Sequence, residues 1–162
     1  MKRILLIEDH EEIRQEMAFM LSKEGFEVDQ ASNGEDALEK LKHSFPDLIF
    51  CDLLMPRMDG KTFLAEFRRL YPRSLCQVVF LTALGDAEHI RSGMTSGADD
   101  YLVKPVEAGQ LLATAHARLK KRDLMKKRLK ELSEQILSAL PHEIRTPLTS
   151  ILGFCDITLK NP

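Results

Sequence analysis

Residues 47–56, with the sequence DLIFCDLLMP, decide the fold of this chain. Residues 48–51 are wholly apolar, as expected for a parallel strand that is buried on both faces. The apolar run ends at a carboxylate, Asp52, and Pro56 and an Asp59-Gly60 turn follow it. A charge at the end of a buried strand is costly unless something there uses it, so Asp52 is a candidate functional residue.

Composition and charge describe a globular chain with an unusually charged surface. The 162 residues suffice for one well-buried domain and an appendage, and 30% of them are charged. The net charge of -2 hides an acidic front and a basic segment, residues 116–130, which holds eight Lys/Arg and one acid. Because nucleic-acid binding requires a basic face, the acidic front argues against nucleic acid as its partner.

Neither cysteines nor apolar runs point to secretion or to a membrane. Cys51, Cys76 and Cys155 are scattered, and we interpret them as reduced core residues. The apolar run after Met1 is too short for a signal peptide, and no run approaches the ~18 residues of a membrane span. We therefore expect a cytoplasmic protein.

Apolar runs and helical patterns alternate five times over the first 120 residues or so. Such alternation predicts βαβ units with right-handed crossovers, and hence an α/β fold with a doubly wound, five-stranded parallel sheet. We expect strands at residues 4–7, 26–28, 48–51, 78–81 and 101–103. Helices are predicted up to Lys23, at 37–41, at 63–67, weakly at 86–96, and from about Glu107 onward.

The last predicted helix continues beyond the domain. Leu112, Ala115 and Leu119 are expected to face the sheet. The pattern then continues at spacing 4-3-4-3, which indicates a coiled-coil seam of about two heptads at Met125, Leu129, Leu132, Ile136 and Ala139. The Lys and Arg residues between these positions form either a solvated coiled-coil face or a contact for an anionic membrane or nucleic acid.

Four strand ends carry polar residues of complementary type. These are Glu8-Asp9, Asp52, Thr82 and Lys104, and ligands of open parallel sheets bind at this edge. Converging carboxylates repel one another unless a cation lies among them, and Mg²⁺ prefers such oxygen ligands. A carboxylate can also act as the nucleophile that forms an aspartyl phosphate. The pattern therefore predicts a magnesium and phosphoryl site.

Residues 1–120 resemble the receiver domain of two-component response regulators. The matching pieces are Glu8-Asp9, residues 52–60, Thr82-Ala83, residues 97–101 and Lys104-Pro105. The resemblance implies a flavodoxin-like sheet of strand order 2-1-3-4-5 and an upstream histidine kinase or phosphotransfer protein as partner.

The resemblance also implies a role for each site residue. Asp52 accepts the phosphoryl group, and Mg²⁺ is held by Glu8, Asp9, Asp52 and the backbone carbonyl of Leu54. Lys104 neutralises the phosphoryl charge, and Thr82 and Tyr101 form the switch pair. The simpler alternatives are a strand-ending Thr82, a surface Lys104, a Tyr101 that only packs, and an Asp59 that is a turn residue and not a ligand.

Two apolar residues predict a long-lived phosphoryl group. Leu54 and Leu84 lie two residues after Asp52 and Thr82, and neither side chain can orient an attacking water. We therefore expect slow hydrolysis of the aspartyl phosphate.

The tail carries a second motif, HEIRTPL at residues 142–148. It resembles the phosphoacceptor motif of sensor histidine kinases, on the first helix of their dimerisation hairpin. The resemblance implies that His142 accepts phosphate from ATP, Glu143 polarises its imidazole and Thr146 helps to position water. Pro141 departs from the small polar residue usual before this histidine and is expected to bend the helix there.

These motifs predict a receiver at residues 1–120, a linker helix at 121–140 and the start of a kinase dimerisation domain at 141–162. No glycine-rich ATP-binding region is present, so ATP would act only through a further catalytic domain. The first hypothesis is part of a hybrid histidine kinase, a homodimer through its C-terminal helix, with Asp52 regulating His142. The alternative is a non-enzymatic adaptor whose receiver controls dimerisation or partner binding. A transcription regulator is poorly supported, because no helix-turn-helix pattern follows.

Overall fold

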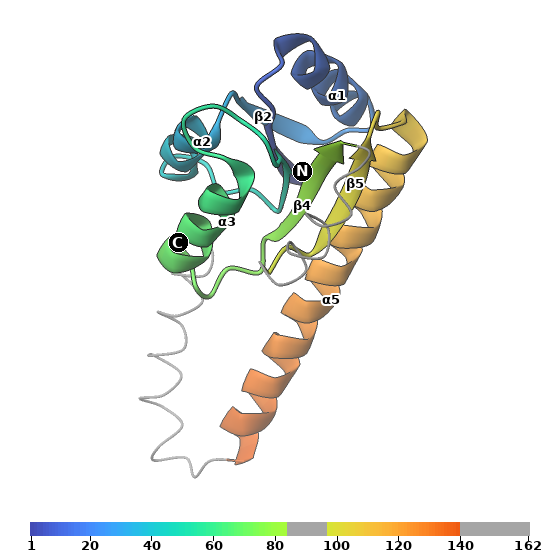
Figure 1. The fold of residues 1–162 in the computed structure, drawn as a ribbon. Coiled ribbons are helices and arrows are strands. Elements are labelled where there is room, and N and C mark those ends of the chain that lie inside the picture. The colour runs from blue at the N-terminus through green and yellow to red at the C-terminus, as the bar shows by residue number, and fades with distance from the viewer. Residues whose placement is uncertain (84–96, 140–162) are drawn as a thin grey trace.

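The computed structural model describes residues 1–83 and 97–139. Five parallel strands form one sheet of order β2-β1-β3-β4-β5, which confirms the predicted flavodoxin-like receiver fold (Figure 1). The strands are β1 (Arg3–Ile7), β2 (Glu27–Ala31), β3 (Leu48–Asp52), β4 (Gln77–Ala83) and β5 (Asp100–Lys104). The helices are α1 (Glu11–Lys23), α2 (Gly34–Leu41), α3 (Gly60–Leu70) and α5 (Ala108–Ala139). The helix expected at 86–96 lies outside the described residues.

Helices cover both faces of the sheet, so its central strand is buried throughout. All five residues of β3 are buried, as the apolar run at 48–51 predicts. On one face the sheet packs against α2 and α3, where Phe63 and Phe67 are fully buried. On the other face it packs against α1 and α5. The two hydrophobic layers hold the strand ends, and with them the polar residues, in fixed register.

The turn after β3 brings the backbone of α3 against the strand end. Asp59 caps α3 by accepting a hydrogen bond from the Thr62 N–H at 2.7 Å, so it acts as a capping residue of the turn. A Cβ on Gly60 would lie 2.3 Å from the backbone oxygen of Asp52. Only glycine therefore allows this close approach, which fixes the loop that follows Asp52.

The long C-terminal helix, α5, is present as a continuous element of 32 residues. Leu111, Ala115 and Leu119 are its buried residues, whereas Leu112, which we expected to face the sheet, is only partly buried. Ala115 and Leu119 are thus buried as predicted, Leu112 packs against the same core, and Leu111 adds a further buried residue to this face. α5 runs unbroken through residue 120, so no break in the helix marks the predicted end of the receiver there. The domain boundaries expected after residues 120 and 140 stay predictions.

The second half of α5 projects beyond the sheet (Figure 1). Four residues of the predicted seam are large and exposed there, with exposed fractions between 42% and 61%, namely Met125, Leu129, Leu132 and Ile136. Two ion pairs anchor the stem of the helix, Arg118 to Asp100 at 2.7 Å and Arg122 to Asp47 at 2.6 Å. Among the described residues, no helix is long and apolar enough to span a bilayer.

Candidate functional site

The carboxyl ends of four strands bring the predicted polar residues to one edge of the sheet. Glu8 follows β1, Asp52 ends β3, Thr82 lies near the end of β4 and Lys104 ends β5. The register aligns these ends, since Asp52 pairs with Leu81 and Ala83 pairs with Lys104. The sequence therefore predicted correctly which side chains share this edge.

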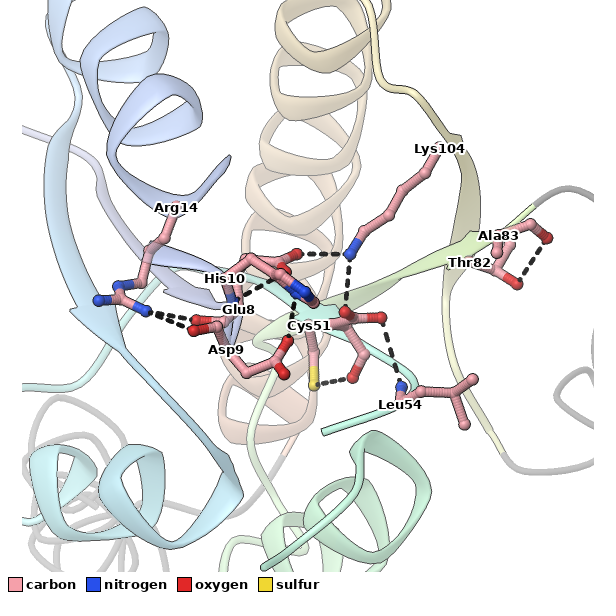
Figure 2. A network of polar contacts seen from close by, with 10 residues as sticks. Glu8, Asp9, His10, Arg14, Cys51, Leu54, Thr82, Ala83 and Lys104 are labelled. Atoms are coloured by element: carbon pink, nitrogen blue, oxygen red, sulfur yellow. Dashed lines mark hydrogen bonds and ion pairs between the residues drawn. The ribbon is translucent and has the colours of Figure 1, made fainter. Parts of the chain in front are cut away.

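Lys104 joins two carboxylates at the centre of the site (Figure 2). Its Nζ donates to Glu8 Oε2 at 2.6 Å and to Asp52 Oδ2 at 2.7 Å. The Glu8 side chain is wholly buried, and those of Asp52 and Lys104 are 10% and 20% exposed. Two carboxylates with so little access to water need a cation between them, and in this state the Lys104 ammonium is that cation.

Burial and hydrogen bonds together shift the pKa values of Glu8 and Lys104. Burial raises the pKa of Glu8, and the nearby Asp52 charge adds to the rise, while the hydrogen bond from Lys104 opposes it. For Lys104, burial alone would lower the pKa, but hydrogen bonds to Asp52 and Glu8 outweigh it and the pKa is raised. Lys104 is therefore charged at neutral pH, whereas ionised Glu8 depends on a neighbouring cation.

Two further residues at the site, His10 and Arg14, were not predicted from the sequence. His10 Nδ1 lies 3.0 Å from Asp9 Oδ1 and 3.4 Å from Glu8 Oε1. Arg14 donates to the backbone carbonyl of Glu8 at 2.7 Å, and so fixes the acidic loop from the first turn of α1 (Figure 2). The signal for His10 was its position directly after Glu8-Asp9 and before α1, and that for Arg14 was its position in the first turn of this helix.

Leu54 approaches the acceptor through its backbone. Its N–H donates to Asp52 Oδ1 at 3.3 Å, and its side chain belongs to a residue that is 65% exposed. The main chain of this loop thus lies beside the Asp52 carboxylate, where a carbonyl could serve as a ligand.

Thr82 and Tyr101 occupy the side of the site away from the acidic loop. Thr82 is buried, and its hydroxyl donates to the Ala83 carbonyl at 3.5 Å (Figure 2). The half-buried Tyr101 ring packs against Phe80, with centroids 5.8 Å apart. The remaining candidates lie outside the described residues, and these are Leu84, His142, Glu143 and Thr146.

The donor set fits a hard divalent cation. Glu8, Asp9 and Asp52 offer only carboxylate oxygens, which is the ligand type that Mg²⁺ prefers, and Asp9 remains 25% exposed toward water. A divalent ion would also supply the positive charge that the two buried carboxylates require.

The chain belongs to the response regulator receiver domain family, whose model matches residues 4–116. It is thus a receiver domain of a two-component system. Receiver domains generally bind Mg²⁺ at the acidic site and interact with a histidine kinase or a phosphotransfer partner.

Among curated proteins, the chain is similar to the transcriptional regulatory proteins DltR of Streptococcus agalactiae and AfsQ1 of Streptomyces coelicolor. It is 30% identical to DltR over 149 residues, which are 92% of this chain and 66% of DltR. It is 38% identical to AfsQ1 over 121 residues, which are 75% of this chain and 52% of AfsQ1. The chain therefore spans between half and two thirds of the length of these relatives. Both are transcriptional regulatory proteins, a class that the sequence motifs supported poorly.

Among solved structures, NtrX from Brucella abortus is similar with a TM-score of 0.73 and 31% identity, covering 80% of this chain and 29% of that one. The signal receiver domain of a signal transduction histidine kinase from Syntrophus aciditrophicus has a TM-score of 0.69 and 28% identity. That match covers 75% of this chain and 92% of the other. Receiver domains like this one thus occur in differently named proteins.

Proposed function

We propose that this receiver accepts a phosphoryl group on Asp52 in a magnesium-dependent reaction. The observation that carries the proposal is the Lys104 ammonium, held within 2.7 Å of both Glu8 and Asp52 at a strand edge. An Asp52 carboxylate oxygen attacks the phosphorus of the donor, the acyl-phosphate bond forms, and the bond to the leaving group breaks with its electron pair. Mg²⁺, when bound by Glu8, Asp9, Asp52 and the Leu54 carbonyl, supplies positive charge for the transferring group.

The other residues respond to the new charge. Lys104 exchanges its contact with Asp52 for one with a phosphoryl oxygen, which keeps the ammonium paired. The Thr82 hydroxyl turns from the Ala83 carbonyl to donate to a second oxygen, and the Tyr101 ring moves inward behind it. In this proposal the repacked surface includes α5, which β5 precedes directly.

The first proposed output is a histidine kinase. The HEIRTPL motif of residues 142–148 and the likeness to a receiver domain of a histidine kinase support it. In this arrangement α5 links Asp52 to His142, Glu143 and Thr146, ATP acts only through a further catalytic domain, and the chain is a homodimer. The exposed residues Met125, Leu129, Leu132 and Ile136 form the coiled-coil seam.

A second candidate is an adaptor without catalytic activity. The exposed seam of α5 favours it, since the same surface can bind a partner helix without any kinase chemistry at His142. Receiver control of transcription also belongs here, because DltR and AfsQ1 are transcriptional regulatory proteins. The candidates differ in whether His142 becomes phosphorylated.

The test is the intact mass of the chain after incubation with acetyl phosphate and Mg²⁺. We expect one added phosphoryl group, which is lost in Asp52→Asn and kept in His142→Gln. No adduct on the wild-type chain would refute the receiver chemistry. For the output, kinase function requires phosphate on His142 when a kinase ATP-binding domain and ATP are supplied. Its absence, with Asp52 still phosphorylated, would leave the adaptor.

A further inference from the structure

The two oxygens of the buried Glu8 carboxylate face different groups. Oε2 accepts from Lys104 at 2.6 Å, on the side of Asp52. Oε1 lies on the side of His10, 3.3 Å from its backbone N–H and 3.4 Å from its Nδ1. Glu8 therefore has one oxygen beside the Lys104 ammonium and a second oxygen that accepts a hydrogen bond from the His10 backbone and lies near the His10 imidazole.

The side of Glu8 that lies near His10 has the ligand atoms of a metal site with both nitrogen and oxygen donors. Carboxylate oxygens of Glu8 and Asp9 and a ring nitrogen of His10 all lie within 4.8 Å of one another, so one ion can contact all three. The His10 side chain is 69% exposed, which leaves the ring accessible from solvent. By contrast, His43 and His116 each lie within 4 Å of a single carboxylate in the described part of the chain.

We propose that Glu8, Asp9 and His10 bind a divalent first-row transition ion of the Ni²⁺ or Zn²⁺ class, with His10 as the residue that selects it over Mg²⁺. Imidazole nitrogen suits these ions, whereas Mg²⁺ prefers an all-oxygen shell. The inference rests on the proposed function in that Glu8 and Asp9 also serve the Mg²⁺ site. An ion bound here therefore competes with Mg²⁺ for both carboxylates.

Calorimetric titration of the untagged chain with Ni²⁺, and separately with Mg²⁺, tests the proposal. His10→Gln removes the ring nitrogen and keeps a polar side chain, and His43→Gln is the matched control at a histidine with one carboxylate neighbour. We expect His10→Gln to weaken the tightest Ni²⁺ site by at least the roughly 10–100-fold that loss of an outer-shell partner costs. Its Mg²⁺ affinity should be unchanged, and His43→Gln should match the wild type for both ions.

Two results would overturn the proposal. Either the Ni²⁺ affinity of His10→Gln equals that of the wild type, or His43→Gln loses as much affinity as His10→Gln. The titration with Mg²⁺ alone tests the magnesium site of the proposed function separately. Absence of Mg²⁺ binding to the wild type, with His10-dependent Ni²⁺ binding intact, would refute the magnesium site and leave the transition-metal site standing.

Discussion

Replacement of Lys104 by alanine leaves two buried carboxylates without their shared cation. Breaking one partner out of a buried ion pair costs about 3–5 kcal/mol. Lys104 retains 20% exposure, and Glu8 can take up a proton in place of the lost pair, so we expect about 2–3 kcal/mol. At about 2–4 °C per kcal/mol for a chain of this size, the unfolding midpoint should fall by about 5–10 °C.

The sign of the pH dependence follows from Glu8. Its pKa is already raised by burial, and Lys104→Ala removes the hydrogen bond that opposes this rise. An acid whose folded pKa exceeds its unfolded value loses stability as the pH rises from the unfolded pKa to the folded one. The penalty of Lys104→Ala should therefore be smaller near pH 5 than at pH 8.

Thermal unfolding with and without Mg²⁺ measures both effects. A bound ion stabilises by about 2.7 kcal/mol at a concentration of 100 Kd, and removal of the competing ammonium should make the Mg²⁺-induced shift larger in Lys104→Ala than in the wild type. Lys127→Ala, which removes an exposed ion pair on α5, is the control and should leave the midpoint unchanged. An unchanged midpoint for Lys104→Ala at pH 8, or a smaller Mg²⁺ shift than in the wild type, would refute the reasoning.

Three further predictions, one of them with a matched glycine control, test separate parts of the account. Gly60→Ala places a Cβ 2.3 Å from a backbone oxygen and should lower the free energy of unfolding, measured by chemical denaturation, by more than about 2 kcal/mol. Gly109→Ala meets open space and should raise the free energy of unfolding by up to about 1 kcal/mol. Arg122→Ala removes the 2.6 Å ion pair with Asp47 and should lower the free energy that holds α5 to the domain by about 1–3 kcal/mol, which should appear as faster amide exchange in α5. Unchanged amide exchange would contradict this prediction. Leu54→Asn can orient water and should shorten the half-life of the aspartyl phosphate about tenfold, or about 1.4 kcal/mol of barrier, and an unchanged half-life would exclude the idea.

The sequence predicted the sheet and the edge that carries the site because both depend on local patterns. The apolar run at 48–51 is typical of a strand buried on two faces, and parallel strands place Glu8, Asp52 and Lys104 at the same edge. Residue types at this edge then predicted a magnesium and phosphoryl site. No side-chain direction was needed for that conclusion.

What depends on side-chain direction could not be predicted. That Leu111 is fully buried and Leu112 only partly buried follows from the rotation of α5 against the sheet, which a helical pattern specifies only to within a residue. The approach of His10 to two carboxylates depends on the backbone at the start of α1. The direction of the Thr82 hydroxyl depends on one torsion angle.

The central claim is that Asp52 is the residue that carries the phosphoryl group. The direct measurement is borohydride reduction after incubation with acetyl phosphate and Mg²⁺, followed by peptide mass mapping, because reduction of an acyl phosphate turns its carboxyl into an alcohol and marks the residue. We predict the mark at Asp52 alone, and none without Mg²⁺. A mark at Asp9 or Glu8, or none on a chain that does take up phosphate, would contradict the account.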